Sequence, residues 1–429
     1  MKIWLGVLVA VSSYLLDMSL ISANSNDLQS LIDATEEGGV LTLQEGEYKG
    51  NFLIQKSMVI IANGHVVITS EQVNEPLFRI EDSQNVSLKG LELISSGTAI
   101  KVNRVKNIEL SNLVLHKVFS GIEVYDSKNV EINHVSVNGK GHHPSNSGNG
   151  IAIFTSTDIT VENSHMNGVQ DGVYIEGVKN IIVTGNEVVN SRYGNHFMYS
   201  ENATIVNNRF TKNVTGLMIM MANEIYVESN DISDQDGFNG TGITLYDTKV
   251  VEVQNNTIAG NKIGLTIQKT ANVRALSNTF QMNQTAVEST NSENSNLLAN
   301  NVFIGNIVNC RTDEIGLNLK NNYYDDYTGI DIDGDGIGDE PYVALQSFGQ
   351  WMVRKPVYQY YVESPSVVLL NQLDQQANRG SQTLLVDQSP LTNKNIKQYK
   401  EWHLNHWQLS IGIALLVLCL IIWRRSVLT

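Results

Sequence analysis

Residues 172–193 read GVYIEGVKNIIVTGNEVVNSRY, and this 22-residue unit sets the period of the chain from Gly150 to Asn300. Glycine recurs at the first position of the unit, in steps of 22 residues with one step of 26. The glycines are Gly150, Gly172, Gly194, Gly216, Gly242 and Gly264. An asparagine stands 14 residues after each of these glycines from Gly172 onward, and after Ala286 and Val308, which continue the 22-residue step. These asparagines are Asn186, Asn208, Asn230, Asn256, Asn278, Asn300 and Asn322. A fixed period of this length indicates repeated structural units.

Each unit contains three short segments in which apolar residues alternate with polar ones. In the unit that begins at Gly172, the apolar positions are Val173, Ile175, Ile181, Val183 and Val188. Alternation with period two predicts strands with one face turned inward. Three strands in 22 residues predict one coil of an all-β, right-handed parallel β-helix, whose coils stack at a spacing of roughly 4.8 Å. A sandwich of unrelated strands is the alternative, and the fixed period argues against it.

The pattern extends beyond the glycine marks and predicts a solenoid of about eleven 22-residue coils between Leu77 and Asn322. We expect the glycines to occupy tight corners that need positive φ, a conformation that asparagine also tolerates. We further expect the seven asparagines to form one ladder along a single corner.

The regions outside the coils have distinct compositions. Residues 1–23 read as a secretory signal peptide, with Lys2 before an apolar run; an uncleaved anchor is the alternative. Residues 24–340 form the predicted β-helix, in which residues 26–37 are a helical cap. Residues 341–406 form an extension with a short helix at 364–376 and a polar, irregular stretch at 378–395.

Residues 407–423 are nearly all apolar, flanked by Trp407 and Trp423 and followed by two arginines. This pattern predicts a C-terminal transmembrane helix with the C-terminus in the cytoplasm and the solenoid on the extracytoplasmic side of the cell membrane. A buried soluble helix is the alternative, but the chain offers no further domain to cover it.

Two coils are longer than the others, with their extra residues at 138–149 and 233–241. Both insertions follow the third strand of a coil, so we expect both loops to leave the same corner. Four coils separate them, so the loops would flank a strip of surface roughly 20 Å wide. His142 and His143 lie in the first loop.

After the last coil, residues 331–339 read DIDGDGIGD. Alternating aspartates with interleaved glycines match the first nine positions of a calcium-binding loop. Position twelve is Tyr342 instead of glutamate, so the loop is not a standard EF-hand. We expect a calcium site formed by Asp331, Asp333, Asp335 and Asp339. An Asp/Gly-rich turn without metal is the alternative.

Charge and cysteine content exclude some classes of protein. The formal net charge is −15, whereas nucleic-acid binding needs a basic surface, so no nucleic-acid partner is expected. Two cysteines, Cys310 and Cys419, provide no disulfide framework, so stacking must supply the stability. Outward carboxylates do not form stacked pairs in the sequence, and Asp171 stands alone before its glycine, which argues against glycoside chemistry.

A histidine- and methionine-rich surface is predicted between the two loops. Residues 193–200 read YGNHFMYS and, one coil later, residues 216–221 read GLMIMM. The inward pattern leaves four soft donors outward, which we call the His/Met patch: His196, Met198, Met218 and Met220. Imidazole and thioether groups suit Cu(I), which makes the patch a candidate copper site. An adaptable contact surface for a protein partner is the alternative.

These residues carry a resemblance to a known family. The run YGNHFMYS, the methionine-rich strand after it, the Asp/Gly loop ending in DEPY at 339–342, and SPSVV at 364–368 resemble NosD-type maturation proteins of nitrous oxide reductase. The resemblance covers nearly the whole exported part, and the C-terminal membrane anchor departs from the usual pattern.

The resemblance implies a non-enzymatic accessory protein for the copper-sulfur centre of nitrous oxide reductase, with that reductase as a partner. It also implies an ABC transporter and a copper chaperone as partners, with Cu(I) handled transiently. A carbohydrate-binding or carbohydrate-processing surface β-helix is the alternative function.

Overall fold

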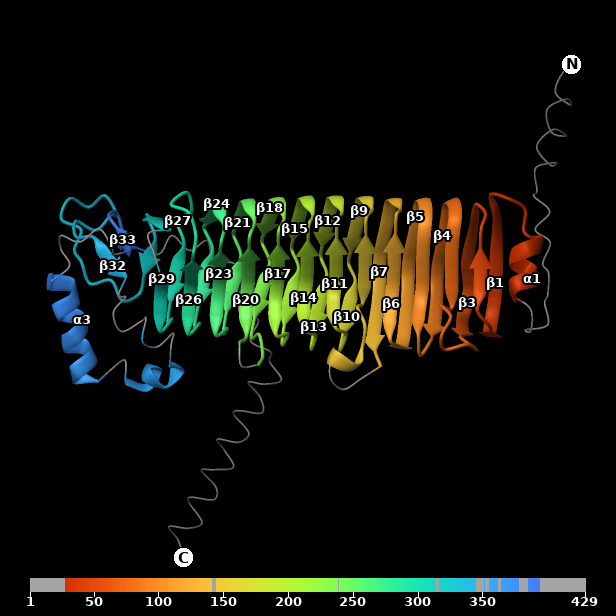
Figure 1. The fold of residues 1–429 in the computed structure, drawn as a ribbon, viewed down its shortest axis with the longest axis horizontal. Coiled ribbons are helices and arrows are strands. Elements are labelled where there is room, and N and C mark those ends of the chain that lie inside the picture. The colour runs from red at the N-terminus through yellow and green to blue at the C-terminus, as the bar shows by residue number, and fades with distance from the viewer. Residues whose placement is uncertain are drawn as a thin grey trace, which may run out of the picture. The chain divides into compact units, whose positions relative to one another are not determined.

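The alternation within each 22-residue unit becomes the three strands of one coil of a β-solenoid. The structure is a computed structural model that describes residues 28–140, 144–237, 239–313, 316–344, 351, 355–361, 364–377 and 385–393. It is a parallel β-solenoid of the right-handed type with about 13 coils, stacked side by side in Figure 1. Eleven of these coils lie between Leu77 and Asn322, as the sequence predicts, and two precede them.

The strands form three faces along the stack. The first face contains β2 (Phe52–Ile54), β6 (Ser120–Tyr125), β8 (Ile151–Phe154), β11 (Asp171–Glu176), β14 (Tyr193–Met198), β17 (Thr215–Met220), β20 (Thr241–Tyr246), β23 (Ile263–Gln268), β26 (Thr285–Thr290) and β29 (Val308–Thr312). The second contains β9 (Thr157–Glu162), β12 (Lys179–Thr184), β15 (Glu201–Val206), β18 (Asn223–Glu228), β21 (Lys249–Gln254), β24 (Ala271–Leu276), β27 (Leu297–Ala299) and β30 (Asn318–Lys320). The third contains β10 (His165–Asn167), β13 (Glu187–Val189), β16 (Arg209–Thr211), β19 (Asp231–Ser233), β22 (Thr257–Ala259), β25 (Thr279–Gln281), β28 (Val302–Ile304) and β31 (Tyr323–Tyr324).

In the first coils the strands continue through the bends and belong to more than one face. These long strands are β1 (Gly39–Lys49), β3 (Met58–Thr69), β4 (Phe78–Ile94), β5 (Thr98–Val118) and β7 (Lys128–Gly139). The pairs between coils are parallel, and inward residues meet inward residues: Val173 lies opposite Asn195, which lies opposite Leu217. Nearly all inward positions are apolar and fully buried, so the core runs continuously along the solenoid.

The repeated glycines are required by close packing between coils, and our prediction of positive φ for them was wrong. A Cβ on Gly194 would lie 2.3 Å from the carbonyl oxygen of Gly216 and 2.5 Å from Phe210. Glycine alone therefore allows this corner to approach the next coil. Positive φ occurs instead at another turn of the coil, at Asn180, Asn202, Glu224, Val250 and Asn272.

A buried asparagine ladder runs along the corner between the second and third faces. The side-chain oxygen of Asn208 accepts hydrogen bonds from the amide and the Nδ2 group of Asn186, at 2.9 and 3.0 Å. The ladder contains Asn186, Asn208, Asn230, Asn256, Asn278, Asn301 and Asn322. Six of the seven predicted asparagines are confirmed.

The prediction of Asn300 was wrong, because Asn301 is the sixth member of the ladder. Asn300 is exposed with φ of 55° at the turn before the ladder position. The step from Asn278 to Asn301 is 23 residues and the step from Asn301 to Asn322 is 21. The two deviations cancel, so a strict 22-residue period predicts Asn278 and Asn322 correctly and misplaces only the position between them.

A second ladder, which the period did not reveal, stabilises the corner between the third and first faces. Its members are Ser191, Asn213, Gln235, Asn261, Asn283 and Asn306. The amides of the first five members each donate to the side-chain oxygen one coil later, at 2.9 to 3.1 Å. The backbone groups at this corner, from which the two long loops leave, are thereby satisfied.

Both ends of the core are covered. Helix α1 (Leu28–Ala34), shorter than the predicted helix at 26–37, buries Leu28 and Ile32 on the first coil. At the other end, β33 (Leu385–Asp387) pairs with β30 and lies antiparallel to β32 (Tyr342–Ala344). The stretch 378–395 was expected to be irregular, yet it supplies this strand.

Asp387 of β33 ends the asparagine ladder. Its fully buried carboxylate accepts hydrogen bonds from the amide of Asn322 at 2.9 Å and from its Nδ2 group at 3.0 Å. The last donors of the ladder are therefore satisfied by a side chain 65 residues further along the chain.

The extension also contains the short 3₁₀ helix η2 (Pro356–Tyr361) and helix α3 (Pro365–Ala377), which starts and ends one residue later than predicted. In the part of the chain that the structure describes, no helix has both the length and the apolar character needed to cross a membrane. The predicted signal peptide (1–23) and transmembrane helix (407–423) lie outside the described residues.

Replacing Asn301 by alanine is expected to destabilise the solenoid by about 2–5 kcal/mol, because two donors of Asn278 lose their acceptor in a buried site. Asn300→Gly is the matched control, since glycine tolerates positive φ and the side chain is exposed; its effect should stay within about 0.5 kcal/mol. Denaturant unfolding followed by circular dichroism measures both. Equal effects would contradict the assignment of the ladder to Asn301.

Candidate functional site

Two long loops flank the middle of the first face, as predicted. One follows β7 and contains the 3₁₀ helix η1 (Pro144–Asn146); the other follows β19 and leads into β20. Four steps between coils separate their points of departure, through β10, β13 and β16. This spacing corresponds to roughly 20 Å. His142 and His143 lie outside the described residues.

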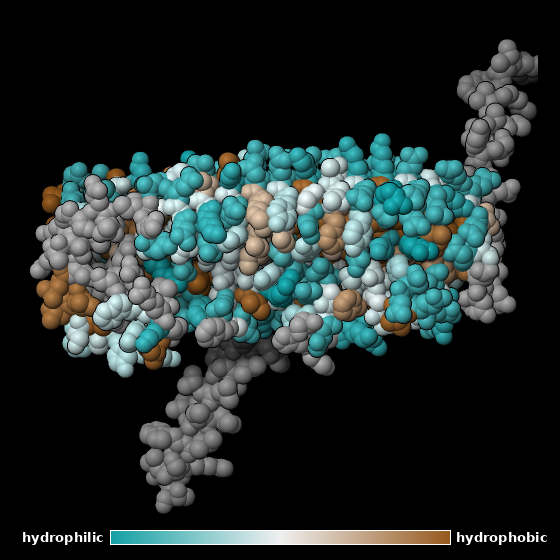
Figure 2. All heavy atoms as spheres, in the orientation of Figure 1, coloured by the Kyte–Doolittle hydropathy of each residue, from teal (hydrophilic) through white to brown (hydrophobic). Residues whose placement is uncertain are grey.

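The predicted His/Met patch lies between these loops on β14 and β17. His196 lies opposite Met218, and Met198 lies opposite Met220. The intervening residues Phe197, Leu217 and Ile219 are fully buried in the core, so the four patch residues are on the outer side of the first face. The three methionines are partly exposed, and Figure 2 shows pale and tan side chains among the teal ones over these middle coils.

His196 differs from the methionines because its side chain is covered although it is on the outer side of the face. The residue is 7 % exposed, and its Nδ1 atom lies 2.9 Å from Oδ2 of Asp171. Asp171 is fully buried at the start of β11, one coil before. The sequence interpretation that Asp171 stands alone was therefore wrong.

Arg192 completes a cluster of three charged or polar side chains. Its Nε donates to Oδ1 of Asp171 at 2.8 Å and its Nη2 donates to Oδ2 at 2.7 Å. This two-pronged contact with Asp171 raises the pKa of the Arg192 guanidinium. In the sequence, Asp171 and Arg192 are 21 residues apart. This separation is close to the 22-residue period, so the two residues become neighbours in consecutive coils. A search for opposite charges about one period apart, without requiring the same position in each unit, would have found the pair.

Two tyrosine rings pack against His196. Tyr174 and Tyr193 each have their ring centre 5.0 Å from that of the imidazole, in edge-to-face geometry. The guanidinium of Arg192 lies over the ring of Tyr193 at 4.5 Å. These contacts exclude water from the imidazole.

Tyr174 also links the cluster to the methionines. Its hydroxyl donates to Glu176 at 2.6 Å and lies 3.5 Å from the sulfur of Met198. Burial, and then the contact with Glu176, raises the pKa of Tyr174 far above its ordinary value. The phenol therefore keeps its proton at neutral pH and acts as a donor.

The Nε2 atom of His196 is buried and has no hydrogen-bond partner in the described part of the structure. Buried polar atoms in folded proteins are almost always paired, so an exception of this kind requires an explanation. Behind it in the core, both polar atoms of the Asn195 side chain are also buried and unpartnered. The coil that contains His196 and Met198 therefore has buried polar atoms without a partner, which the described residues of the coils on either side do not have.

The second predicted site, the Asp/Gly loop, is well ordered by its own backbone. Carboxylate oxygens of Asp331, Asp333 and Asp335 lie within 4.8 Å of one another. Asp339, the fourth predicted ligand, is not in this group; its Oδ2 accepts the amide of Ile332 at 2.6 Å. The side chain of Tyr342, at position twelve, is buried against Asn309 and Asp326 and points to no shared ligand position.

The loop is held to the solenoid by the end of the extension. Gly338 donates to Pro390 at 2.8 Å, and Thr392 donates to Gly336 at 3.0 Å. The amides of Gly336 and Gly334 lower the pKa of Asp331, so this carboxylate is ionised at neutral pH. Three oxygen-bearing side chains that converge in a negatively charged loop have the donor chemistry that Ca²⁺ requires.

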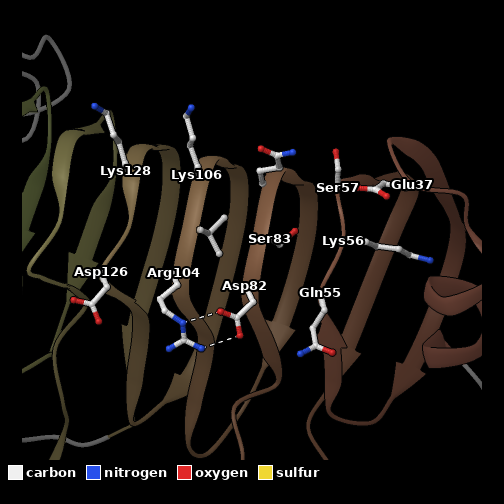
Figure 3. A pocket seen from close by; sticks show the side chains of 12 residues that line it. Glu37, Gln55, Lys56, Ser57, Asp82, Ser83, Arg104, Lys106, Asp126 and Lys128 are labelled. Atoms are coloured by element: carbon white, nitrogen blue, oxygen red, sulfur yellow. Dashed lines mark hydrogen bonds and ion pairs between the residues drawn. The ribbon is translucent and has the colours of Figure 1, made fainter.

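A groove of about 480 Å³ lies on the N-terminal coils, away from the His/Met patch. Figure 3 shows a row with Lys106 and Lys128 on one side and a row with Asp82, Arg104 and Asp126 on the other. Arg104 donates to both carboxylate oxygens of Asp82, at 2.7 and 2.8 Å. Because these charges satisfy each other, the groove has less free charge than its composition suggests.

The middle of the chain matches a known protein family. Residues 134–335, a little under half of the sequence, match the family model described as "Periplasmic copper-binding protein (NosD)". This segment contains the His/Met patch, the Asp171 cluster and Asp331 to Asp335 of the loop. The resemblance stated from the sequence motifs is therefore confirmed. No curated protein sequence matches the chain.

Solved structures similar to this one share the fold at low sequence identity. The A-module of mannuronan C-5 epimerase AlgE6 from Azotobacter vinelandii matches with a TM-score of 0.55 and 16% identity, over 68% of this chain and 92% of that one. A PL6 alginate lyase in complex with a trisaccharide matches with a TM-score of 0.50 and 13% identity, over 69% and 81% of the two chains. At these identities the likeness establishes the parallel β-helix fold alone.

We predict that calcium binds the Asp331 loop and stabilises the protein. At a calcium concentration about 100 times the dissociation constant, binding to the native state alone adds about 2.7 kcal/mol. Thermal unfolding with calcium or with a chelator should therefore differ by several degrees. The difference should disappear in Asp333→Asn and persist in Asp247→Asn, an aspartate on a solenoid turn outside the loop. Identical melting in calcium and chelator would show that the loop is only a turn.

Proposed function

Residues 134–335 of this chain match the NosD family model, and on this premise we propose that the protein is a non-enzymatic accessory factor for nitrous oxide reductase. It acts on the extracytoplasmic side of the membrane, where the copper-sulfur centre of the reductase is assembled. Its partners are the reductase, an ABC transporter and a copper chaperone. The family description as periplasmic and copper-binding supports this role and this location.

The bare Nε2 atom of His196 is the observation that carries the proposal. A neutral imidazole nitrogen is a good copper ligand, and thioethers are soft donors that favour Cu(I) over calcium and magnesium. The methionine opposite His196 is one inter-coil spacing away, roughly 4.8 Å at the backbone, and Met198 is two residues along the strand, roughly 7 Å away. Rigid side chains would not converge over such distances, but methionine side chains are long and flexible.

The patch combines one oriented ligand with several adjustable ones. His196 is fixed by its contacts with Asp171, Tyr174 and Tyr193. The methionines are partly exposed and free to change rotamer. A site of this kind holds Cu(I) loosely, which suits transfer between proteins better than storage. The exposed thioethers also provide an adaptable surface for the partner that delivers or receives the ion.

Cu(I) titration against a competing chromophoric chelator under reducing conditions tests the proposal. Met218→Leu with Met220→Leu, and separately His196→Ala, should each lower the affinity at least tenfold. Met282→Leu is the matched control, because Met282 is 66% exposed and lies outside the patch. The titration uses the Cys419→Ser background, so that the thiol of the C-terminal apolar run does not bind Cu(I). The other cysteine, Cys310, needs no replacement: burial keeps the pKa of its thiol far above the ordinary value, so that thiol stays protonated.

Two results would limit the proposal in different ways. Wild-type protein that binds no Cu(I), together with failed reductase maturation in His196→Ala, would leave the patch with a docking role only. Unchanged binding and maturation in both patch variants would place the function elsewhere.

Carbohydrate processing is a second candidate, favoured by the Asp171–His196 pair, in which a bare Nε2 could accept a proton from a sugar carbon. The fold is shared with an epimerase and a lyase that act on mannuronan and alginate. Of the nearby aromatic rings, Tyr125 and Phe154 stack on each other, with their ring centres 4.7 Å apart. Incubation with alginate that yields no unsaturated product and no change in epimer ratio would exclude this candidate.

We also propose that residues 407–423 anchor the protein in the membrane. The apolar run, with tryptophans at both ends and arginines after it, supports this proposal. A chain that ends at Lys400 is expected in the soluble fraction after export, whereas the full chain should remain with the membrane. Membrane association of the truncated chain at high salt and at alkaline pH would contradict the proposal.

A further inference from the structure

We infer that Asp171, held in place by Arg192, is a positioning residue that sets the tautomer of His196 and leaves its Nε2 atom with a free lone pair. The assignment of the tautomer stands on the hydrogen bonds alone. The consequence for Cu(I) affinity rests on the proposed function.

Hydrogen-bond accounting assigns the proton on the imidazole. A carboxylate only accepts hydrogen bonds, so Nδ1 of His196 must carry the hydrogen in its 2.9 Å contact with Asp171. Nε2 has no acceptor among the described residues, so a hydrogen there would be buried without a partner. The Nδ1–H tautomer with a bare Nε2 is therefore the form that fits its surroundings. In this tautomer Nδ1 donates to Asp171, and Nε2 keeps a free lone pair.

Arg192 prevents the Asp171 carboxylate from turning. Oδ1 accepts from Nε of Arg192, and Oδ2 accepts from both Nη2 of Arg192 and Nδ1 of His196. The plane of the guanidinium thus fixes the plane of the carboxylate. Arg192 is in turn packed on Tyr193, whose ring contacts His196. Asp171, Arg192, Tyr193 and His196 form a closed ring of contacts from two consecutive coils.

This arrangement is more than a surface ion pair. Asp171 has no exposed side-chain surface, and the His196 side chain is 9% exposed. Burying these groups costs free energy, and the unpartnered Nε2 adds to that cost. A histidine that donates one ring nitrogen to a carboxylate and offers the other to a metal is a recurrent arrangement, in which the carboxylate orients the ring and raises its basicity. Loss of such a carboxylate typically lowers metal affinity by about 10–100-fold.

Nitrogen-15 NMR of the full-length protein in detergent, labelled at histidine, tests the tautomer without metal. The two-bond proton–nitrogen pattern distinguishes the Nδ1–H from the Nε2–H form, and the His196 signals are identified by their loss in His196→Gln. We expect the Nδ1–H pattern in the wild type. The Nε2–H pattern would overturn the inference, whatever the copper result. The Nδ1–H pattern without Cu(I) binding would support the positioning role and overturn only the proposed function.

Two variants test the consequence for affinity. Asp171→Asn should lower Cu(I) affinity about 10–100-fold and convert part of the His196 signal to the Nε2–H form. Asp158→Asn is the matched control, because Asp158 pairs with Lys128 on the surface. This variant should change neither the Cu(I) affinity nor the tautomer of His196. If Asp171→Asn does not fold, Arg192→Lys keeps the charge but cannot contact both oxygens, and it should shift both readouts in the same direction. Unchanged affinity and tautomer in the folded variants would overturn the inference.

Discussion

The structure depends on the constraint that every coil must lie one strand spacing above the last, in the same register. The corner glycines make this approach possible, since a Cβ at Gly172 would lie 2.5 Å from both the carbonyl of Gly194 and a methyl group of Val188. The two ladders of buried polar side chains then satisfy the backbone at two corners and penalise any change of register. Because register is fixed over the whole stack, side chains one coil apart on the outer surface are held at a constant spacing.

The candidate site uses this spacing. Asp171 and Arg192 come from consecutive coils, as do His196 and Met218, and none of these pairs is close in sequence. The rigid stack orients the imidazole, while the methionines are partly exposed and have long, flexible side chains. The site thus combines a fixed ligand with adaptable ones, and the solenoid supplies the fixed part. Asn195 interrupts the apolar core next to His196, and the polar atoms of its side chain are buried without a hydrogen-bond partner among the described residues.

The two ends of the chain contribute to the solenoid in different ways. Helix α1 covers the first coil with an apolar surface, which is local in sequence to the coil that it covers. The other end is closed by β33, whose Asp387 binds the last asparagine of the ladder and whose following residues hold the Asp331 loop. The polar extension is therefore part of the fold, although its composition resembles that of a linker.

The sequence by itself determined the repeat, the three strands per coil and the inward face of each strand. The reason is that a two-residue alternation within a fixed period assigns each strand residue to either the inner or the outer side. It also determined that the His/Met patch lies on the outer side of the first face, between two loops. The tertiary structure decided what the period could not: that Asn301 replaces Asn300, because two opposite deviations in length cancel, and that the glycines serve contact between coils. It also decided that Asp171 is buried against Arg192 and His196. The sequence could not show this contact, because the three residues do not occupy the same position in their 22-residue units and the contact depends on the direction of each side chain.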